Sequence, residues 1–302
     1  MSHTFTRSFR IRYYECDPYG YVNNANYLRY ATQAAMEASA DAGYDLAKYD
    51  ELGTLWLIRE AGIEYLRPAQ YGDTLNVKTW VSDFRRVRSR REYELTLAST
   101  GELAARVYAD WVYLDAQTQQ PARIPAELIA AFFPEGAPPA LERAPFPEPP
   151  APPPGAFTTR RRVRWHHLDP TGHMNNAWYL SLTEDVGIEA AAHVGWPMQR
   201  AAEHGFAFFA REYRIECLRP ALMDDDLKFT TYLGEVRRSS VVRHHLIHQA
   251  SGELIARARV TWVLVNIHTR RPMQVPAEVW RDFEGQIADL PHPPGPLARL
   301  PK

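Results

Sequence analysis

The sequence predicts an α+β protein made of two tandem copies of one domain. Three observations lead to this interpretation. A twelve-residue segment occurs twice, the same order of strand-like and helical patterns follows each occurrence, and a proline-rich stretch separates the copies. The chain of 302 residues is long enough for two domains of about 150 residues each.

The repeat is the most informative feature of the sequence. Residues 17–28 read DPYGYVNNANYL and residues 169–180 read DPTGHMNNAWYL, and eight of these twelve positions are identical. The offset of 152 positions then falls to 151 along the chain. The later matches are Arg67-Pro68 with Arg219-Pro220, Gly101-Glu102-Leu103 with Gly252-Glu253-Leu254, and Trp111 with Trp262. Blocks in register over most of both copies indicate a duplicated domain.

A proline-rich stretch over residues 134–155 lies between the copies. Proline removes a backbone donor and fixes φ, so we expect an extended polyproline II linker that stays outside any sheet. The predicted division is an N-terminal domain over 1–133, a linker over 134–156, a C-terminal domain over 157–290 and a proline-rich, poorly ordered tail over 291–302.

Each copy has the same expected order of elements, β-α-β-β-β-β, followed by a short helix that starts after a proline. Alternating arginine and apolar residues predict a first strand at 9–14 and at 162–165. An Asp-Pro-x-Gly turn then precedes a long, alanine-rich helix, and an asparagine pair lies where its N-cap is needed. The helices are expected at 24–42 and 176–194. The later strands are expected near 54–66, 73–83, 89–98 and 103–114, and near 206–218, 226–236, 240–249 and 254–267. A five-stranded antiparallel sheet that wraps around one central helix accounts for this order.

Composition excludes several classes of function. The net charge is −1, which gives no basic surface for nucleic acid, and no apolar run reaches the length of a membrane span. The N-terminal residues lack the apolar core of a signal peptide, and there are only two cysteines, so we expect a cytoplasmic protein with reduced thiols. Neither a metal-ligand cluster nor a glycine-rich nucleotide turn is present in the sequence, so we expect no metal and no cofactor.

The motif around the aspartate turn resembles a known family. The segment 13–28 is similar to the opening motif of hotdog-fold thioesterases of the 4-hydroxybenzoyl-CoA thioesterase class. Copy two resembles the catalytic half of plant-type acyl-ACP thioesterases, through the segment DPTGHMNN at 169–176 and the segment EYRIEC at 212–217. The resemblance covers nearly all of each copy, and it implies a tandem double hotdog that hydrolyses acyl thioesters.

The same resemblance implies a set of site residues. In copy two it implies Asp169, His173 and Glu216 as the catalytic set, while Thr171 stands where the family has an asparagine. In copy one the implied catalytic residues are Asp17 and Glu64, and Tyr21 stands where copy two has His173. Copy one therefore cannot perform identical chemistry. The residues expected to contact substrate are Thr171, Asn175, Asn23 and Tyr21.

Chemistry supports the aspartates independently. Thioester hydrolysis needs a nucleophile or base beside the carbonyl carbon, and donors for the developing oxyanion. An aspartate just before a helix suits the first task, and the N–H groups of the first helical turn suit the second. The alternative is that Asp17 and Asp169 only start a turn. Asn23 and Asn175 are expected mainly to cap the helices, with substrate contact as a secondary role.

Two further features leave alternatives open. Because neighbouring strand residues point to opposite faces, only one of Glu216 and Cys217 can face the site. Copy one keeps the glutamate and not the cysteine, so the glutamate is favoured over a Cys-His hydrolase and Cys217 is interpreted as a core residue. The run of arginines at 85–91 is either a solvated hairpin or a docking surface for the phosphates of CoA or for an acidic carrier protein.

The predicted function is hydrolysis of an acyl-CoA or acyl-ACP thioester in fatty acid metabolism, with copy two as the main seat of catalysis. The copies are expected to pack as an intrachain pseudo-dimer with the sites at their seam, and a further homo-oligomer stays open. One alternative is hydration or dehydration of an enoyl thioester on the same fold. Another is a non-catalytic binder of acyl thioesters.

Overall fold

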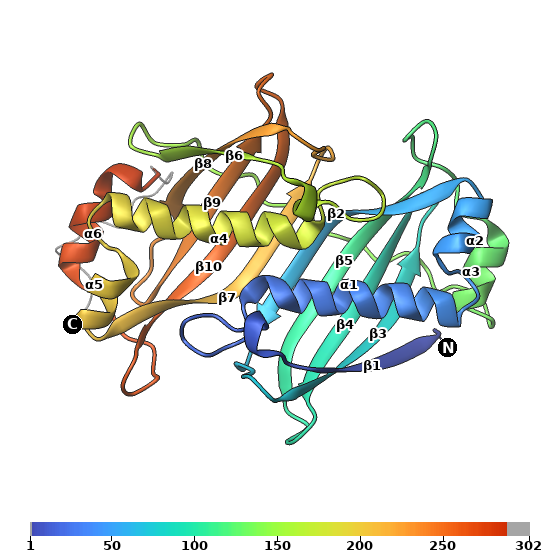
Figure 1. Cartoon of the computed structure of the whole chain (residues 1–302), viewed down its shortest axis with the longest axis horizontal. Helices are drawn as coiled ribbons and strands as arrows, with labels where there is room; N and C mark the ends of the chain where they lie inside the picture. Colours follow the sequence, from blue (N-terminus) through green and yellow to red (C-terminus); the bar gives the residue numbers. More distant parts are fainter. Residues whose placement is uncertain (1, 289–302) are drawn as a thin grey trace. The chain divides into compact units, whose positions relative to one another are not determined.

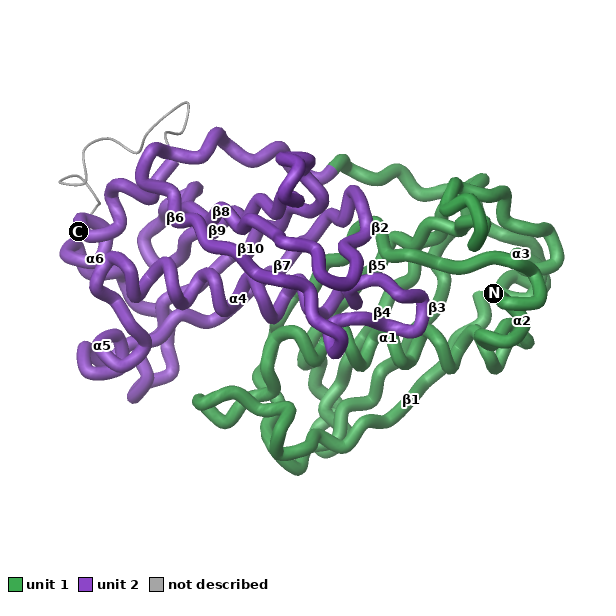
Figure 2. Tube along the Cα trace, turned by 45° about the horizontal axis from the view of Figure 1, so that its top comes forward, with its two compact units in different colours: residues 1–145 green, residues 146–302 purple. Residues whose placement is uncertain are grey.

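A computed structural model describes residues 2–288 of the chain. It contains two compact units, residues 1–145 and 146–302 (Figure 2). The boundary between them falls inside the proline-rich stretch, so each unit carries part of that stretch. The expected tail at 291–302 lies outside the described residues. No helix within residues 2–288 is long and apolar enough to cross a membrane.

Unit 1 is a five-stranded antiparallel sheet with one long helix, α1, across one face (Figure 1). The strand order is β1-β3-β4-β5-β2. Two shorter helices, α2 and α3, pack over one end of the sheet. The bounds are β1 Thr4–Arg10, α1 Asn24–Asp41, α2 Leu46–Glu51, β2 Thr54–Tyr65, β3 Thr74–Phe84, β4 Arg88–Leu97, β5 Leu103–Asp115 and α3 Ala126–Phe132.

Unit 2 repeats this arrangement, with five antiparallel strands in the order β7-β10-β9-β8-β6 and the helix α4 across one face (Figure 1). The bounds are β6 Phe157–Arg162, α4 Asn176–His193, α5 Met198–Glu203, β7 Phe206–Cys217, β8 Asp226–Gly234, β9 Ser240–His248, β10 Leu254–Asn266 and α6 Ala277–Phe283. The expected five strands and central helix of each copy are thereby confirmed.

Small side chains let the central helix lie close to its sheet. In α1, Ala31, Ala34 and Ala38 are completely buried, at 0% exposure, and they recur at the three- and four-residue spacing of one helical face. The strands alternate instead, and β4 buries every second residue along its first eight positions. These two periods explain why the expected helices and later strands agree with the structure to within a residue or two.

The expected first strands are wrong in position. β1 ends at Arg10 and β6 at Arg162, and each is followed by a short 3-10 helix, Tyr13–Glu15 or Trp165–His167. In unit 1 the Glu15 carboxylate accepts a hydrogen bond from the Arg12 backbone N–H at 2.7 Å, which favours a turn over continued strand pairing. The aromatic residues taken for strand positions therefore lie in an exposed turn, with Tyr13 at 81% exposure.

Candidate active site

The aspartate turn of unit 2 is a closed loop directly before α4. The backbone N–H of Asp169 donates to the carbonyl of His173 at 2.9 Å, and the N–H of Gly172 donates to the carbonyl of Asp169 at 2.9 Å. Gly172 has φ +79°, a left-handed conformation that glycine adopts without steric cost. These bonds fix the backbone on which the predicted catalytic side chains stand.

Three predicted site residues of this turn are joined through one hydroxyl group. Thr171 Oγ1 lies 2.5 Å from Asp169 Oδ1 and 3.1 Å from His173 Nδ1. The backbone N–H of Thr171 also donates to Asp169 Oδ1, at 2.9 Å. The structure thus brings Asp169, Thr171 and His173 together as a hydrogen-bonded chain, an arrangement able to hold a base in a fixed orientation.

Burial tunes the histidine of this chain. His173 is only 9% exposed, and burial lowers the pKa of its imidazole, while the negative charge of Asp169 opposes that shift. A lowered pKa keeps the ring neutral at pH 7, and a neutral imidazole can accept a proton.

The matching turn of unit 1 is held differently. Asp17 Oδ1 accepts the backbone N–H groups of Tyr19 at 2.9 Å and Tyr21 at 3.1 Å. Burial raises the pKa of the Asp17 carboxyl, although these backbone donors oppose the shift. Tyr21 offers no basic nitrogen where unit 2 has His173, so the two turns present different chemical groups.

The asparagines at the helix starts are N-caps, as expected. Asn23 Oδ1 accepts the N–H of Ala25 at 3.0 Å, and Asn175 Oδ1 accepts the N–H of Ala177 at 3.0 Å. Each cap satisfies one of the donors at the helix start. Their secondary role, contact with substrate, stays a prediction.

Glu216 lies on the face of the sheet opposite to α4. Tyr213, three residues earlier on β7, points toward α4, because its hydroxyl is 2.8 Å from Thr183 Oγ1. Alternation then places Cys217 on the α4 face and Glu216 on the other. On that face Glu216 Oε2 accepts from Arg257 Nε at 2.7 Å, and both side chains are largely buried.

Glu64 has the matching position in unit 1. Its Oε2 lies 3.5 Å from Arg106 Nη1, and the two side chains are 39% and 59% exposed. The pair is therefore more loosely held than that of Glu216 and Arg257. Both glutamates sit opposite an arginine of the neighbouring strand, which pairs with the carboxylate. Their predicted catalytic role stays a prediction.

The arginine run of unit 1 is not one surface. Arg90 makes a bidentate pair with Asp110, at 2.8 and 2.6 Å. Arg91 is buried beneath the sheet, 6% exposed, with its guanidinium 5.2 Å from the ring centre of Phe132. Neither a solvated hairpin nor a docking surface describes these two arginines. The strand period sends one to each face of β4, and only Arg85, Arg86 and Arg88 are exposed.

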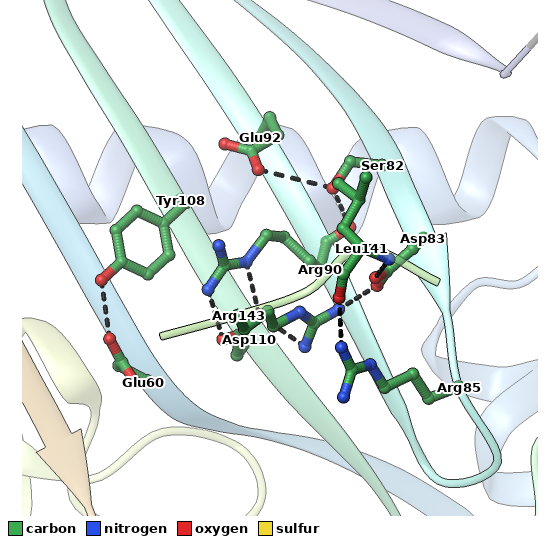
Figure 3. Close-up of polar contacts among 10 residues, drawn as sticks. All are labelled: Glu60, Ser82, Asp83, Arg85, Arg90, Glu92, Tyr108, Asp110, Leu141 and Arg143. Atoms are coloured by element: carbon green, nitrogen blue, oxygen red, sulfur yellow. Dashed lines mark hydrogen bonds and ion pairs between the residues drawn. The ribbon is translucent and has the colours of Figure 1, made fainter. Parts of the chain in front are cut away.

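A charged cluster on the outer face of the unit 1 sheet was missed by the sequence interpretation (Figure 3). Arg143, from the proline-rich stretch, donates to Asp83 and lies 2.9 Å from Asp110 Oδ1. The backbone N–H of Leu141 donates to Asp83 Oδ2 at 2.9 Å. The stretch therefore runs across the sheet face opposite to α1 and stays outside the sheet, as expected. No motif in the sequence pairs Arg143 with Asp83, which lie 60 positions apart.

The rest of the proline-rich stretch is fastened to unit 2. Phe146 is 7% exposed and lies under two guanidinium groups, Arg214 at 5.3 Å and Arg257 at 5.1 Å from its ring centre. Glu148 Oε2 accepts from Arg257 Nη1 at 2.5 Å. The Tyr232 hydroxyl donates to the carbonyl of Pro150 at 2.5 Å.

No group of three or more His, Cys, Asp or Glu residues within 2–288 could hold a metal ion.

His167, a buried histidine shortly before the aspartate turn, was not among the predicted site residues, and its contacts are structural. Its Nδ1 accepts the backbone N–H of Arg164 at 3.1 Å, and its ring lies 4.6 Å from that of Trp178.

Comparison with known families decides what these two units are. The family model described as the Thioesterase-like superfamily matches the chain twice, over residues 11–132 and 163–283. The chain belongs to the Thioesterase-like superfamily. The expected family is thereby confirmed, and both matches include the aspartate turn and the central helix of their copy.

Curated relatives match either most of the chain or about one copy of the repeat. The chain is 24% identical over 277 residues to a chloroplastic acyl-(acyl-carrier-protein) hydrolase of Cuphea viscosissima. The match covers 85% of this chain and 62% of that relative. The chain is 24% identical over 275 residues to the dodecanoyl-(acyl-carrier-protein) hydrolase of Umbellularia californica, with 85% and 67% covered. The long-chain acyl-CoA thioesterase FadM of Escherichia coli is 27% identical over 133 residues, covering 43% of this chain and 98% of FadM.

Solved structures of thioesterases share the fold. A putative oleoyl thioesterase from Lactobacillus plantarum has a TM-score of 0.75 at 20% identity, covering 87% of this chain and 96% of that one. The 12:0-ACP thioesterase from Umbellularia californica has a TM-score of 0.69 at 19% identity, with 86% and 93% covered. The predicted tandem double hotdog is thus confirmed.

Proposed function

We propose that this member of the Thioesterase-like superfamily hydrolyses acyl thioesters of CoA or of acyl carrier protein, to a carboxylic acid and a thiol. The observation that carries the proposal is the hydrogen-bonded chain of Asp169, Thr171 and His173 at the start of α4. The relatives named above are hydrolases of acyl-ACP or acyl-CoA, and they support the reaction class.

The proposed chemistry uses the turn and the helix together. Asp169 and His173 supply the basic groups, and water adds to the thioester carbonyl while His173 takes its proton. The positive end of the α4 dipole stabilises the negative oxygen that forms. Expulsion of the thiolate, which takes up the proton, completes the hydrolysis.

We propose that unit 2 holds the principal site. Its turn carries a neutral, buried imidazole, whereas the Asp17 turn of unit 1 carries Tyr21 at that position. Asp17 and Glu64 form a second, weaker site in this proposal. Glu216 is kept in the principal set on the family resemblance, and Arg257 fixes the position of its carboxylate.

The proposal is tested by thiol release from a panel of acyl-CoA and acyl-ACP thioesters. Hydration of crotonyl-CoA is measured in a separate assay, which tests the alternative of an enoyl-thioester hydratase. Asp169→Asn is expected to lower kcat by about 10² to 10⁴, and Asp17→Asn by less. Asp45→Asn is a matched control, because Asp45 caps α2 through Lys48 and lies outside both aspartate turns. Hydrolysis that survives the double change at Asp17 and Asp169 would show the assignment to be wrong.

Four points remain predictions beside this proposal: a cytoplasmic location, a place in fatty acid metabolism, an intrachain pseudo-dimer and a further homo-oligomer. Light scattering of the full chain after size-exclusion chromatography reads the last of these directly. A molar mass near 34.6 kDa would exclude the homo-oligomer.

A further inference from the structure

We propose that Thr171 is a positioning residue that fixes His173 in the tautomer protonated on Nδ1, which leaves Nε2 as the proton-accepting atom. The inference rests on the proposed function and deepens it at one position. Thr171 is where this chain departs from the asparagine of the plant-type family, so its part in the site cannot be carried over from the resemblance.

The hydroxyl of Thr171 has one proton and two close neighbours. An ionised carboxylate can only accept hydrogen bonds, so the contact of 2.5 Å between Thr171 Oγ1 and Asp169 Oδ1 is donated by the hydroxyl. Its short length is that of a hydroxyl bonded to a charged oxygen. The proton of Thr171 is therefore committed to Asp169.

The second contact of the hydroxyl then has a fixed direction. Thr171 Oγ1 lies 3.1 Å from His173 Nδ1, and with its proton on Asp169 the oxygen has only lone pairs to offer. His173 must donate from Nδ1–H. A neutral imidazole carries one N–H, so Nε2 is left with its lone pair, and burial, which lowers the pKa, keeps the ring neutral.

Backbone hydrogen bonds support this direction of donation, from His173 to Thr171 and from Thr171 to Asp169. The carboxylate is fixed by the N–H of Thr171 at 2.9 Å, and the loop is closed by the bond from the Asp169 N–H to the His173 carbonyl. The Thr171 hydroxyl thus orients the His173 imidazole, and Asp169 influences the imidazole only through that hydroxyl. Unit 1 has Tyr21 in place of the imidazole, and its Asp17 Oδ1 accepts the backbone N–H groups of Tyr19 and Tyr21.

Thr171→Val tests the inference, because valine keeps the branched shape and removes the hydroxyl. We expect kcat to fall by about tenfold to a hundredfold while KM changes by less than about threefold, since an imidazole in the wrong tautomer is a poor base. Thr171→Ser restores the hydroxyl and is expected to recover kcat to within about threefold of wild type. Thr118→Val is the matched control, since it removes another threonine–aspartate hydrogen bond, to Asp115, at a turn remote in sequence from the site.

The second readout is the tautomer itself, by ¹⁵N NMR of imidazole-labelled full-length protein at pH 7.5. His173→Gln identifies the resonances of His173. We expect wild type to show Nδ1 protonated and Nε2 unprotonated, and Thr171→Val to lose that preference. Protonated Nε2 in wild type, or equal kcat for wild type and Thr171→Val, would overturn the inference.

These outcomes separate the inference from the proposed function. If Asp169→Asn abolishes hydrolysis while Thr171→Val keeps wild-type kcat, the site stands and the positioning role falls. If no thioester in the panel is hydrolysed, the proposed function falls, and the NMR measurement still decides the tautomer. Equal losses in Thr171→Val and Thr171→Ser would show that the hydroxyl is not what matters.

Discussion

Replacing Arg143 by methionine should destabilise unit 1 far more than the loss of an ordinary surface charge. The guanidinium binds two aspartates, Asp83 and Asp110, whose side chains are 0% and 10% exposed, and the Arg143 side chain is itself 10% exposed. Removing one partner from such a buried pair leaves an uncompensated charge. The expected cost is about 3–5 kcal/mol in the free energy of unfolding.

Urea denaturation of the full chain measures this effect. With a slope of about 1–3 kcal/mol per molar for a small domain, the midpoint of the unit 1 transition should fall by at least about 1 M. Arg67→Met is the matched control, because its pair with Glu102 is about half exposed, and it should cost less than about 1 kcal/mol. Asp83→Asn combined with Arg143→Met should recover part of the loss. Equal midpoints for Arg143→Met and Arg67→Met would refute the account of a buried cluster.

Three further outcomes are expected. Asn175→Ala and Asn23→Ala should each cost about 1 kcal/mol of stability through loss of an N-cap, seen as lower Tm in calorimetry, and an unchanged Tm would contradict the capping role. Burial lowers the pKa of His244 to about 4 from 6.5, so as the pH falls this histidine is protonated in the unfolded chain before it is protonated in the folded chain. Stability should therefore fall by about 3 kcal/mol as the pH drops through this range, and a His244→Gln variant that showed the same fall would contradict this. Gly62→Ala should cost about 1–3 kcal/mol, because the new Cβ would stand 2.2 Å from Tyr108 Cε1; wild-type urea stability would show that the ring moves freely.

The repeat, the sheets and the central helices could be predicted because each rests on local periodicity. Asn23 marked the start of α1, and alternation placed the later strands to within a residue or two. The first strand was misplaced because the Arg12 backbone N–H donates to the Glu15 carboxylate and favours a turn there, which periodicity cannot reveal. Helix α2, six residues long, is too short to give a helical period.

The sequence predicted which residues form the candidate site, but it did not predict the hydrogen bonds between them. The motif singled out Asp169 and His173, but the bridging part of Thr171 depends on the turn geometry, and the direction of Glu216 depends on which strand face meets α4. Arg143 was unpredictable for another reason. It meets Asp83 across about sixty residues of chain, and an arginine among prolines looks like a solvent-exposed residue until the partner is known.

The path of the proline-rich stretch limits where the chain can be divided into fragments that keep the contacts of each unit. A fragment that ended at residue 133, the predicted end of the N-terminal domain, would discard Arg143 and remove its positive charge from beside Asp83. A fragment that began at residue 157 would discard Phe146 and expose Arg214 and Arg257. Insertions or substitutions in this stretch would therefore act on domain interiors as well as on the tether, so its sequence is constrained by the charges it covers.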